Sequence, residues 1–418
     1  MAGPTIKLSH PVKSLSGNVP LTGSKSESNR ALIIQALSGG NVTIENLSAA
    51  ADTVTLQHAL AASTAADRKI ETVIDIGPAG TAMRFLTAYL SINGGQATLT
   101  GSDRMKQRPI GILVDALNTL GAHIQYAGAT GYPPLAIDGA FKQETAHVRI
   151  KGNVSSQYLS ALLLIASALP QGLELQIEGE LTSRPYLTMT LDMLAEAGIQ
   201  HQWNGDRITI APQATKPCRL TVEPDWSAAS YWYAMVALAE DANLFLPNLK
   251  KHSLQGDAAI RDIMVHFGVA STFEDGGLRI QKTTSVHPAE KTLFDFTECP
   301  DLAQTVIVCA AAQRRNLSFT GLHTLKIKET DRIAALQNEL GKFGVKLVED
   351  GRVYHLVTEG LFRPQHLTIE TYEDHRMAMA FAPLALLFDG VQINEPDVVE
   401  KSYPDFWKHL KQHGFILS

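Results

Sequence analysis

The stretch GSKSESNRALIIQAL, residues 23–37, joins a polar, basic segment to an apolar helical run. The polar segment contains Lys25, Arg30 and three serines. A helix start already has unpaired N–H groups and a partial positive charge, so cations there are unfavourable unless an anion binds beside them. The stretch therefore predicts an anion site at the N-terminus of a helix.

Basic residues also stand at five further expected helix starts: Arg84, Arg108, Arg184, the pair Lys328 and Arg332, and Arg376. A single cation at such a place is usually a solvated surface residue. Recurrence at so many helix starts instead favours a protein built to hold several anionic groups.

The composition is that of an ordinary globular protein. The chain has 418 residues, of which 45% are hydrophobic, enough for two or three domains with a substantial core. Its 36 basic and 42 acidic side chains give a net charge of −6, which opposes broad binding to nucleic acid or to an anionic membrane. The anion sites are therefore expected to be local and to serve small molecules.

Cysteine content and apolar run length bear on the compartment. The three cysteines lack metal-ligand spacing, which favours a reducing compartment. Residues 1–7 have no apolar segment typical of a signal peptide, and the longest apolar runs, such as residues 161–166, are too short to span a bilayer. We therefore expect a cytoplasmic protein without a membrane role.

The chain contains an internal repeat of about 73 residues. Helical runs that end in glycine recur at this period, at Gly121, Gly198, Gly268, Gly344 and Gly414. A second set of helices has the same period and begins near Gly80, Ser155, Ser227, Asp301 and His375. With a first pair of helices near Ser28 and Asp52, the pattern predicts six units of two helices each.

Short alternating segments between the helices predict strands, so each unit combines α and β structure. The clearest are residues 148–151, 173–177, 207–210 and 367–369. Six similar units suggest two lobes of three units, with helix N-termini converging on a central cleft. Duplication that serves stability alone would give the same period, but it would not explain why basic and hydroxyl residues gather at helix starts.

The donors at the helix starts exceed the needs of one phosphate. Each phosphate carries roughly −1.5 to −2 charge at neutral pH, so the set suits two small substrates that each carry phosphate and carboxylate. Among the acids, Asp301 and Asp331 are interpreted first as helix caps, whereas Glu329 could be a cap or a proton-transfer group. A carboxylate and a lysine in one anion pocket could move protons, because neighbouring charges tune their pKa values.

Motifs for other chemistries are missing. The chain has no serine nucleophile elbow, no phosphate loop ending in Gly-Lys-Ser/Thr and no metal-ligand set at the required spacing. Gly77 and Gly80 lack the third glycine and the acidic residue of a dinucleotide fingerprint. The residues therefore favour group transfer without a covalent enzyme intermediate or a metal.

Seven blocks of sequence, taken together, point to a known family. They are residues 23–30, 79–84, 104–110, 155–157, 328–332, 374–378 and 401–405. The pattern resembles the enolpyruvyl transferase family, and within it the 5-enolpyruvylshikimate-3-phosphate synthases, over nearly the whole chain. The resemblance implies an α/β protein of two similar lobes, each of three βαβαββ units with pseudo-threefold symmetry, and an active site in the interlobe cleft.

The two expected lobes differ in how the chain builds them. Residues 21–223 form a continuous lobe of three repeat units, and residues 1–20 with 224–418 form a discontinuous one, also of three. Repulsion between two cationic surfaces opposes closure until an anionic ligand binds, so we expect an open form without ligand. A monomer is expected.

The resemblance also implies the reaction. The 5-hydroxyl of shikimate 3-phosphate attacks C2 of phosphoenolpyruvate while C3 is protonated, and the tetrahedral intermediate then expels phosphate. This carboxyvinyl transfer belongs to the shikimate pathway of aromatic amino-acid biosynthesis. No cofactor and no nucleic-acid or membrane partner is implied, and glyphosate is expected to compete with phosphoenolpyruvate.

Site residues follow from the matching positions. Those implied to hold shikimate 3-phosphate are Ser26, Arg30, Ser155, Ser156, Ser183, Tyr186 and Lys328. Those implied to hold phosphoenolpyruvate are Lys25, Gly80, Arg108, Arg332, Arg376 and Lys401, with Gln157 between the substrates and Arg84 and Thr324 as further binding residues. As catalytic residues, Asp301 would accept or orient the 5-hydroxyl proton and Glu329 would handle the C3 proton. Lys25 and Lys401 would neutralise or protonate the departing phosphate.

Three positions depart from the family pattern. Pro78 and Thr324 each replace a commonly seen Asn, and Phe85 stands where Pro is common. Pro78 has neither an N–H donor nor a side-chain amide, so hydrogen bonds there must be lost or supplied elsewhere. We therefore expect altered ligand affinity, and the prediction of glyphosate competition is weaker for this chain.

Two alternatives remain beside this interpretation. A related transferase that uses a UDP-amino sugar typically has a loop cysteine as acid, but residues 101–108 contain none. A non-catalytic scaffold that binds phosphorylated metabolites would need the anion donors, but not Asp301 or Glu329 in proton-transfer positions. Phosphate release that requires both substrates together would distinguish the transferase from the scaffold.

Overall fold

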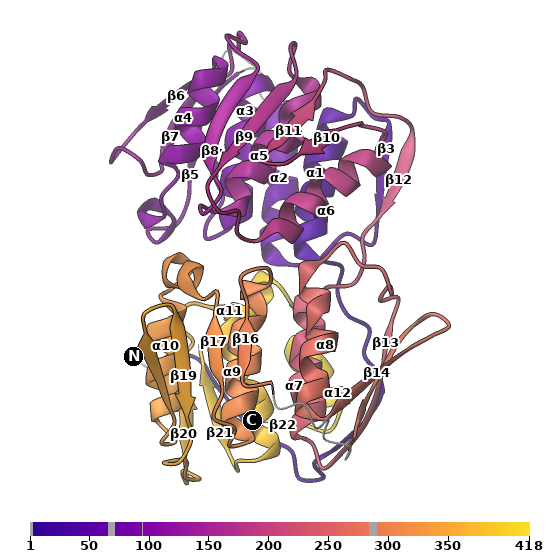
Figure 1. Cartoon of the computed structure of the whole chain (residues 1–418), viewed down its shortest axis with the longest axis vertical. Coiled ribbons are helices and arrows are strands. Elements are labelled where there is room, and N and C mark those ends of the chain that lie inside the picture. The colour runs from indigo at the N-terminus through magenta and orange to yellow at the C-terminus, as the bar shows by residue number, and fades with distance from the viewer. Residues whose placement is uncertain (1–2, 66–71, 94, 284–290) are drawn as a thin grey trace. The chain divides into compact units, whose positions relative to one another are not determined.

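The computed structural model describes residues 3–65, 72–93, 95–283 and 291–418. The chain divides into two compact units. The continuous unit is Gly23–Val222, and the discontinuous unit combines Met1–Thr22 with Glu223–Ser418 (Figure 1). The chain therefore passes from one unit to the other twice, and the N-terminal segment belongs with the C-terminal half.

Helices form the interior of the continuous unit. Three of them, α1 (Lys25–Leu37), α3 (Gly80–Asn93) and α5 (Ser156–Ile165), pack against one another. Their apolar side chains are buried, which provides the core of the unit. Each of three further helices contacts two of these inner helices: α2 (Ala51–Ala65), α4 (Gly111–Leu120) and α6 (Arg184–Glu196).

Two four-stranded sheets belong to the continuous unit. The first has the order β4-β5-β7-β6, from β4 (Thr72–Asp75), β5 (Gln96–Thr100), β6 (His123–Tyr126) and β7 (Leu135–Asp138). The second has the order β10-β11-β9-β8, from β8 (His147–Lys151), β9 (Leu173–Glu178), β10 (Gln202–Asn204) and β11 (Arg207–Ile210). In each sheet, the first two strands of the repeat are parallel and a helix connects them, and the last two strands form an antiparallel hairpin. Both sequence repeats therefore have the order βαβαββ along the chain.

The third sheet of the continuous unit differs from the expected pattern. Among the described residues it has two parallel strands only, β3 (Val42–Glu45) and β12 (Cys218–Thr221). These strands come from opposite ends of the unit's sequence, so their pairing closes the unit on itself. In the described part of the chain, this repeat therefore has fewer paired strands than the expected βαβαββ unit.

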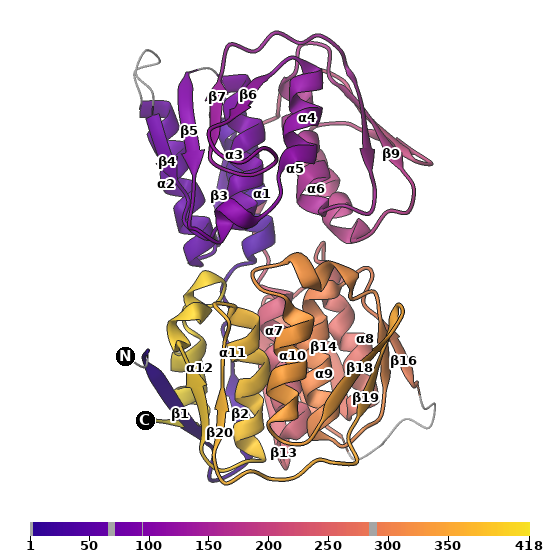
Figure 2. The same cartoon turned by 90° about the vertical axis from the view of Figure 1, so that its left-hand side faces the viewer.

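The discontinuous unit also has three inner helices that pack together, α7 (Trp226–Leu238), α9 (Ala303–Ala312) and α11 (His375–Phe381). The second helix of each repeat follows: α8 (Ile260–Met264), α10 (Arg332–Gly341) and α12 (Phe406–Gln412). Figure 2 shows α9, α10 and α11 side by side. Short 3-10 helices precede several of these helices, among them η3 (Gly256–Ala259), η5 (Pro300–Leu302), η6 (His323–Ile327) and η8 (Pro396–Lys401).

Three four-stranded sheets belong to the discontinuous unit. One is β14-β15-β13-β2, from β2 (Ser14–Asn18), β13 (Asp241–Pro247), β14 (Val269–Glu274) and β15 (Gly277–Lys282). Another is β16-β17-β19-β18, from β16 (Leu293–Asp295), β17 (Ser318–Thr320), β18 (Lys346–Asp350) and β19 (Val353–Val357). The last is β20-β21-β1-β22, from β1 (Thr5–Ser9), β20 (Leu367–Ile369), β21 (Val391–Asn394) and β22 (Ile416–Leu417). The N-terminal β1, indigo in Figure 2, thus completes a sheet built from the C-terminal end.

The repeat predicted from glycine spacing is confirmed in the backbone. Gly121 directly follows α4 with φ 107°, and an added Cβ there would lie 2.0 Å from the carbonyl oxygen of Lys142. Gly344, shortly after α10, has φ 81° and leaves a similar gap of 2.1 Å to the carbonyl oxygen of Gly360. The left-handed backbone at both glycines cannot continue a helix, and the close carbonyl groups leave no space for a side chain.

In the described parts of the chain, none of the helices is both long enough and apolar enough to cross a membrane.

Candidate active site

The helix starts of the discontinuous unit meet in one network of ion pairs. Asp301 lies in η5, which leads into α9, and each of its carboxylate oxygens faces a guanidinium group. Arg376 Nη2 lies 3.0 Å from Asp301 Oδ2, and Arg332 Nη1 lies 3.0 Å from Oδ1. Lys328 Nζ is 3.7 Å from Oδ1. Residues from α9, α10 and α11 that are far apart in sequence therefore form one charged cluster.

Arg332, the first residue of α10, is the centre of this cluster. Its Nη2 donates to Glu329 Oε2 at 2.9 Å and its Nε donates to Asp374 Oδ2 at 2.7 Å. Together with Asp301, three carboxylates surround a guanidinium whose side chain is 2% exposed. Burial alone would lower the pKa of Arg332, but these carboxylates raise it, so the cation is permanent.

Glu329 links the cluster to the segment before α12. Its Oε1 lies 3.4 Å from the Nζ of Lys401, the last residue of η8. The two candidate proton-transfer carboxylates, Glu329 and Asp301, therefore share Arg332, and each also faces a lysine. Of the seven discontinuous-unit residues predicted from sequence, the structure brings six together, and the exception is Thr324.

The charge state of Asp301 follows from these neighbours. Burial raises the pKa of a carboxyl group, but Arg376, Lys328 and Arg332 outweigh burial and hold the pKa of Asp301 well below its usual range. Lys328 responds oppositely: burial lowers its pKa, and Asp301 offsets only part of that effect. Asp301 is thus an anion held between three cations, one of which is poised to lose a proton more readily than a free lysine.

The capping interpretation is confirmed for one acid and wrong for the other. Asp331 is the N-cap of α10, where its Oδ1 accepts the backbone N–H groups of Ile333 and Ala334 at 3.1 Å. Asp301 lies inside η5, which has no side-chain cap hydrogen bond, and its oxygens face the guanidinium groups instead. The two roles differ because Asp331 precedes its helix whereas Asp301 lies inside one. A sequence pattern does not locate a helix start to a single residue, so it could not tell these positions apart.

Three residues that join this network were not predicted from sequence. Asp374 caps α11 by accepting the N–H of Arg376 at 2.9 Å, and it also holds Arg332. Ser227, in the first turn of α7, donates to Asp257 and accepts from Arg376 Nη2 at 3.4 Å. Asp374 is the first residue of the family block 374–378 and was therefore within reach of the pattern. Asp257 lies in the short 3-10 helix η3, outside every motif of the sequence, so only the structure could find it.

In the continuous unit, Lys25 forms the start of α1 and pairs with an acid that the sequence interpretation did not select. Its Nζ lies 3.2 Å from Asp52 Oδ2 in the first turn of α2, and the two side chains are 15% and 4% exposed. An acid at a helix start is favourable in its own right, so Asp52 can orient Lys25 without losing its own stabilisation.

Arg30 is held almost entirely by the protein. Its Nε donates to Thr190 Oγ1 at 2.7 Å, its Nη1 to the carbonyl oxygen of Ser26 at 2.9 Å, and its Nη2 to Ser160 Oγ and the carbonyl oxygen of Tyr186. These bonds use four of its five N–H groups. Burial lowers its pKa to about 10, which leaves a rigid cation whose field an anionic ligand would compensate.

The rings of Phe85 and Tyr186 also contact Arg30, with centroids 5.5 and 5.7 Å from its Cζ. Phe85 is the residue that departs from the family pattern. The structure gives that departure a role, because an aromatic face against a buried guanidinium is a cation–π contact.

The starts of α3 and α5 meet as predicted. Gln157 Nε2 donates to Thr81 Oγ1 at 3.2 Å. Arg108 lies directly against Gly80, since a Cβ added to Gly80 would be 2.6 Å from Arg108 Nη1. Arg84 also binds the backbone here, because its Nη1 donates to the carbonyl oxygen of Gly80 at 3.2 Å. A side chain at position 80 would therefore displace the Arg108 guanidinium from this place.

The predicted serines lie at helix starts of the same unit. Ser155 is the N-cap of α5 and accepts the N–H of Gln157, with Ser156 as the first helical residue. Ser183, buried, adopts φ 57° directly before α6, and Tyr186 lies in the first turn of α6. Ser26 lies in the first turn of α1, one residue after Lys25. These hydroxyls share the helix ends with Arg30 and Gln157.

Two predicted features do not join these clusters. Arg184 is exposed, and its Cζ lies 4.3 Å from the centroid of the Trp203 ring, so the surface interpretation holds for this cation. Thr324 lies in η6, and its buried Oγ1 has no hydrogen-bond partner within the described residues. Thr324 therefore remains a candidate through its unused hydroxyl rather than through a contact.

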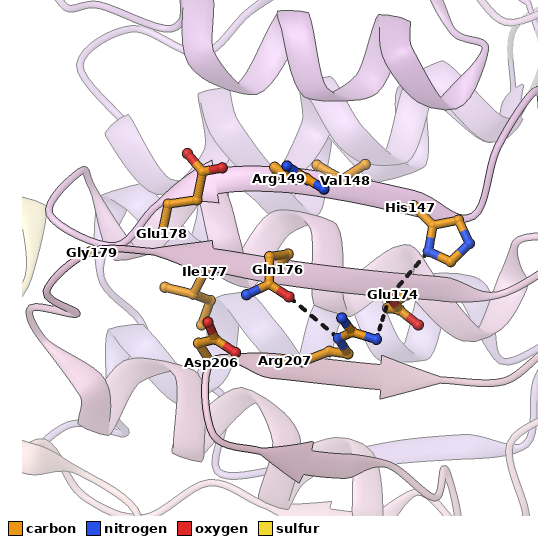
Figure 3. Close-up of a pocket in the computed structure, with 10 residues that line it drawn as sticks. All are labelled: His147, Val148, Arg149, Glu174, Gln176, Ile177, Glu178, Gly179, Asp206 and Arg207. Atoms are coloured by element: carbon orange, nitrogen blue, oxygen red, sulfur yellow. Dashed lines mark hydrogen bonds and ion pairs between the residues drawn. The ribbon is translucent and has the colours of Figure 1, made fainter.

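A hollow of about 520 Å³ over β8, β9 and β11 contains none of the predicted site residues (Figure 3). Three of its side chains already pair with each other: Arg207 Nη1 and His147 Nδ1 lie 3.1 and 3.2 Å from Glu174 Oε1. It is a groove on the face of a sheet, and the helix-start clusters are the better candidates because their charges remain concentrated and buried.

Solved structures define the class to which this fold belongs. EPSP synthase from Acinetobacter baumannii matches with a TM-score of 0.77 and 21% identity over 99% of both chains. The enolpyruvyl transferase NikO from Streptomyces tendae matches with a TM-score of 0.73 and 15% identity over 100% of this chain and 99% of its own. The chain thus has the fold of the enolpyruvyl transferases.

Sequence comparison identifies the family within this class. The model of the family EPSP synthase (3-phosphoshikimate 1-carboxyvinyltransferase) matches residues 9–410. A 3-phosphoshikimate 1-carboxyvinyltransferase of Bacteroides fragilis is 46% identical over 96% of both chains. One of Burkholderia cenocepacia is 36% identical over 95% of this chain and 96% of its own. The chain belongs to the EPSP synthase family.

Proposed function

We propose that this chain is a 3-phosphoshikimate 1-carboxyvinyltransferase, which transfers the carboxyvinyl group of phosphoenolpyruvate to the 5-hydroxyl of shikimate 3-phosphate and releases phosphate. The observation that carries the proposal is identity of 46% with a relative of that name over 96% of both chains. The charged clusters agree with it, because they offer buried cations for anionic substrates and two carboxylates for proton transfer.

The addition step uses the pair of carboxylates on Arg332. As the 5-hydroxyl oxygen bonds to C2 of phosphoenolpyruvate, its proton passes to Asp301 and C3 receives a proton from Glu329. Asp301 is a weak base while Arg376, Lys328 and Arg332 face it. Bound anionic substrates compensate those cations, so the pKa of Asp301 rises toward its ordinary range when the reaction needs a base.

In the elimination step the bond from C2 to the phosphate oxygen breaks, and C3 returns a proton to Glu329 as the double bond forms again. Lys25 and Lys401 neutralise or protonate the leaving phosphate. The contact of Lys401 with Glu329 at 3.4 Å supports this assignment, because one lysine then serves both the leaving group and the carboxylate that exchanges the C3 proton.

The other assigned residues bind the substrates: Ser26, Arg30, Ser155, Ser156, Ser183, Tyr186 and Lys328 for shikimate 3-phosphate, and Gly80, Arg108, Arg332 and Arg376 for phosphoenolpyruvate, with Gln157 between them and Arg84 and Thr324 as further binding residues. Their place at helix starts supports this role, because N–H groups and cations there attract phosphate and carboxylate. A monomeric, cytoplasmic enzyme stays a prediction from composition.

The proposal is tested by a coupled phosphate-release assay. We expect release with both substrates together and none with either alone, or with a UDP-amino sugar in place of shikimate 3-phosphate. Asp301→Ala and Glu329→Ala should each lower kcat by roughly 10²–10⁴-fold. Asp331→Ala is the matched control, since it removes a neighbouring carboxylate that only caps α10. Wild-type inactivity would overturn the function, and full activity of both variants would overturn the proton-transfer roles.

A further inference from the structure

Residues 253–257 of the discontinuous unit contact the start of α7 through every second side chain. Ser253 Oγ donates to Glu223 Oε2 at 2.6 Å, and Gln255 Oε1 accepts the backbone N–H of Trp226 at 2.8 Å. The third side chain, Asp257, is 5% exposed and accepts the hydroxyl of Ser227. The loop is thus fixed along its length before it reaches the charged cluster.

Ser227 connects Asp257 to the guanidinium of Arg376. Its Oγ donates to Asp257 and accepts from Arg376 Nη2 at 3.4 Å. The same nitrogen lies 3.0 Å from Asp301 Oδ2. An Nη nitrogen has two N–H groups, so one can point to Ser227 and the other to Asp301. The direction of the serine lone pair therefore helps to set the orientation of Arg376.

An ordinary structural role does not explain the carboxylate at position 257. Gln255, not Asp257, is the N-cap residue of η3, and that helix start has no side-chain cap hydrogen bond. Asp301, Arg376 and Asp225 influence the Asp257 carboxyl, and Cys299 is also near enough to interact. Burial, followed by the negative charge of Asp301, raises its pKa to about 7. A buried acid beside another acid is costly for folding alone.

We propose that Asp257 is a positioning residue of the carboxyvinyl transfer, which holds the Ser227 hydroxyl so that Ser227 fixes Arg376 against Asp301. The inference rests on the proposed function. Asp257 does not touch a reacting atom; it controls where the guanidinium of Arg376 stands when phosphoenolpyruvate binds. Its loss should therefore weaken phosphoenolpyruvate binding more than it slows the chemical step.

The test is a double-mutant cycle with Asp257→Ala, Ser227→Ala and the double variant. At saturating shikimate 3-phosphate, each single variant should raise KM for phosphoenolpyruvate by roughly tenfold, as lost orienting partners typically do, with a smaller change in kcat. Because the two residues act in series, the double variant should resemble either single variant. Effects that multiply in the double variant would overturn the relay.

Asp257→Asn separates orientation from folding, because its amide oxygen can still accept the Ser227 hydroxyl but cannot titrate. Its KM for phosphoenolpyruvate should be close to that of wild type, in contrast to the raised KM of Asp257→Ala. The ratio of its kcat/KM to that of wild type should change between about pH 6 and 8. An unchanged KM in Asp257→Ala and Asp257→Asn, with only a lower melting temperature, would show a merely structural role and overturn the proposal.

Asp262→Ala is the matched control. Asp262 follows Asp257 closely in sequence, but its side chain is 72% exposed and pairs with the adjacent Arg261. Its kinetic constants should equal those of wild type. Failure of the two proposals is distinguishable: an inactive wild type would overturn the function, whereas an active wild type whose Asp257 variants all behave like Asp262→Ala would overturn only this inference.

Discussion

At the scale of single residues, Arg332 decides whether the acids of the discontinuous unit can lie together. Its guanidinium nitrogens lie between 2.7 and 3.0 Å from carboxylate oxygens of Asp301, Glu329 and Asp374, so the cation stands between the three acids. Without it, three carboxylates would face one another in a buried place, where like charges repel strongly. The guanidinium is planar and has five donors in a fixed fork, which a lysine ammonium cannot reproduce.

Arg332→Lys should accordingly lower both activity and stability. A single ammonium leaves at least one buried carboxylate without its hydrogen bond, which costs roughly 1–3 kcal/mol of unfolding free energy. Urea unfolding measures this cost, and phosphate release measures the activity. Arg261→Lys is the control, because its ion-pair partner Asp262 is 72% exposed and the pair should contribute less than about 1 kcal/mol. Equal stability of the two variants would contradict the role of Arg332.

Asp257 should make stability depend on pH. An unfolded aspartate titrates near pH 3.9, whereas burial and Asp301 raise the pKa of Asp257 to about 7 in the folded chain. Between these values the folded chain binds more protons than the unfolded chain, so the contribution of this group to stability falls as pH rises from about 4 to about 7. Asp257→Asn should therefore gain stability relative to wild type across that range. Urea unfolding at several pH values checks this, and a constant difference would contradict it.

At the scale of elements, the helices begin and end where local chemistry requires it. Asp225, Asp331 and Asp374 each accept a backbone N–H at a helix start, which satisfies donors that the helix leaves unpaired. Five repeats end their second helix with a glycine of positive φ: Gly121, Gly198, Gly268, Gly344 and Gly414. These signals are local, which is why the helix pairs were predictable from the sequence.

Gly344→Ala tests the cost of such an end. An alanine there must adopt φ near 81° and place its Cβ 2.1 Å from the carbonyl oxygen of Gly360, so the backbone has to move. Gly351 has φ 60° but nothing within 4 Å of an added Cβ. Gly351→Ala should cost only the left-handed strain of about 1–2 kcal/mol, and Gly344→Ala clearly more. Equal shifts in the urea midpoint would contradict the steric explanation.

At the scale of the whole molecule, the residues proposed to serve one reaction come from both units. Lys25, Arg30 and Arg108 belong to the continuous unit, whereas Asp301 and Arg332 belong to the discontinuous one. Both clusters are rich in cations, so bringing them together is unfavourable until an anion is bound. Closure on the first substrate therefore stays a prediction.

Small-angle X-ray scattering measures this closure. Shikimate 3-phosphate should reduce the radius of gyration, because its negative charge would compensate the repulsion expected between two cationic surfaces. Inorganic sulfate at the same ionic strength is the control, since screening alone should have a smaller effect. An unchanged radius at saturating shikimate 3-phosphate would contradict the prediction.

The local part of this protein was determined by its sequence. The repeat of about 73 residues, the helix pairs and the cations at helix starts follow from hydrophobic period, caps and glycines. These features depend on residues within a few positions of one another. The strands that were predicted, such as residues 207–210, follow from alternation of the same short range.

Only the tertiary structure decided which charges meet. Asp301 proved to be an anion between guanidinium groups rather than a cap, and Asp257 joined Arg376 through a serine 30 positions away in sequence. The two-stranded pairing of β3 with β12 likewise joins opposite ends of one unit. Such contacts depend on how helices pack, and packing brings together residues whose separation along the chain contains no information about their distance in space.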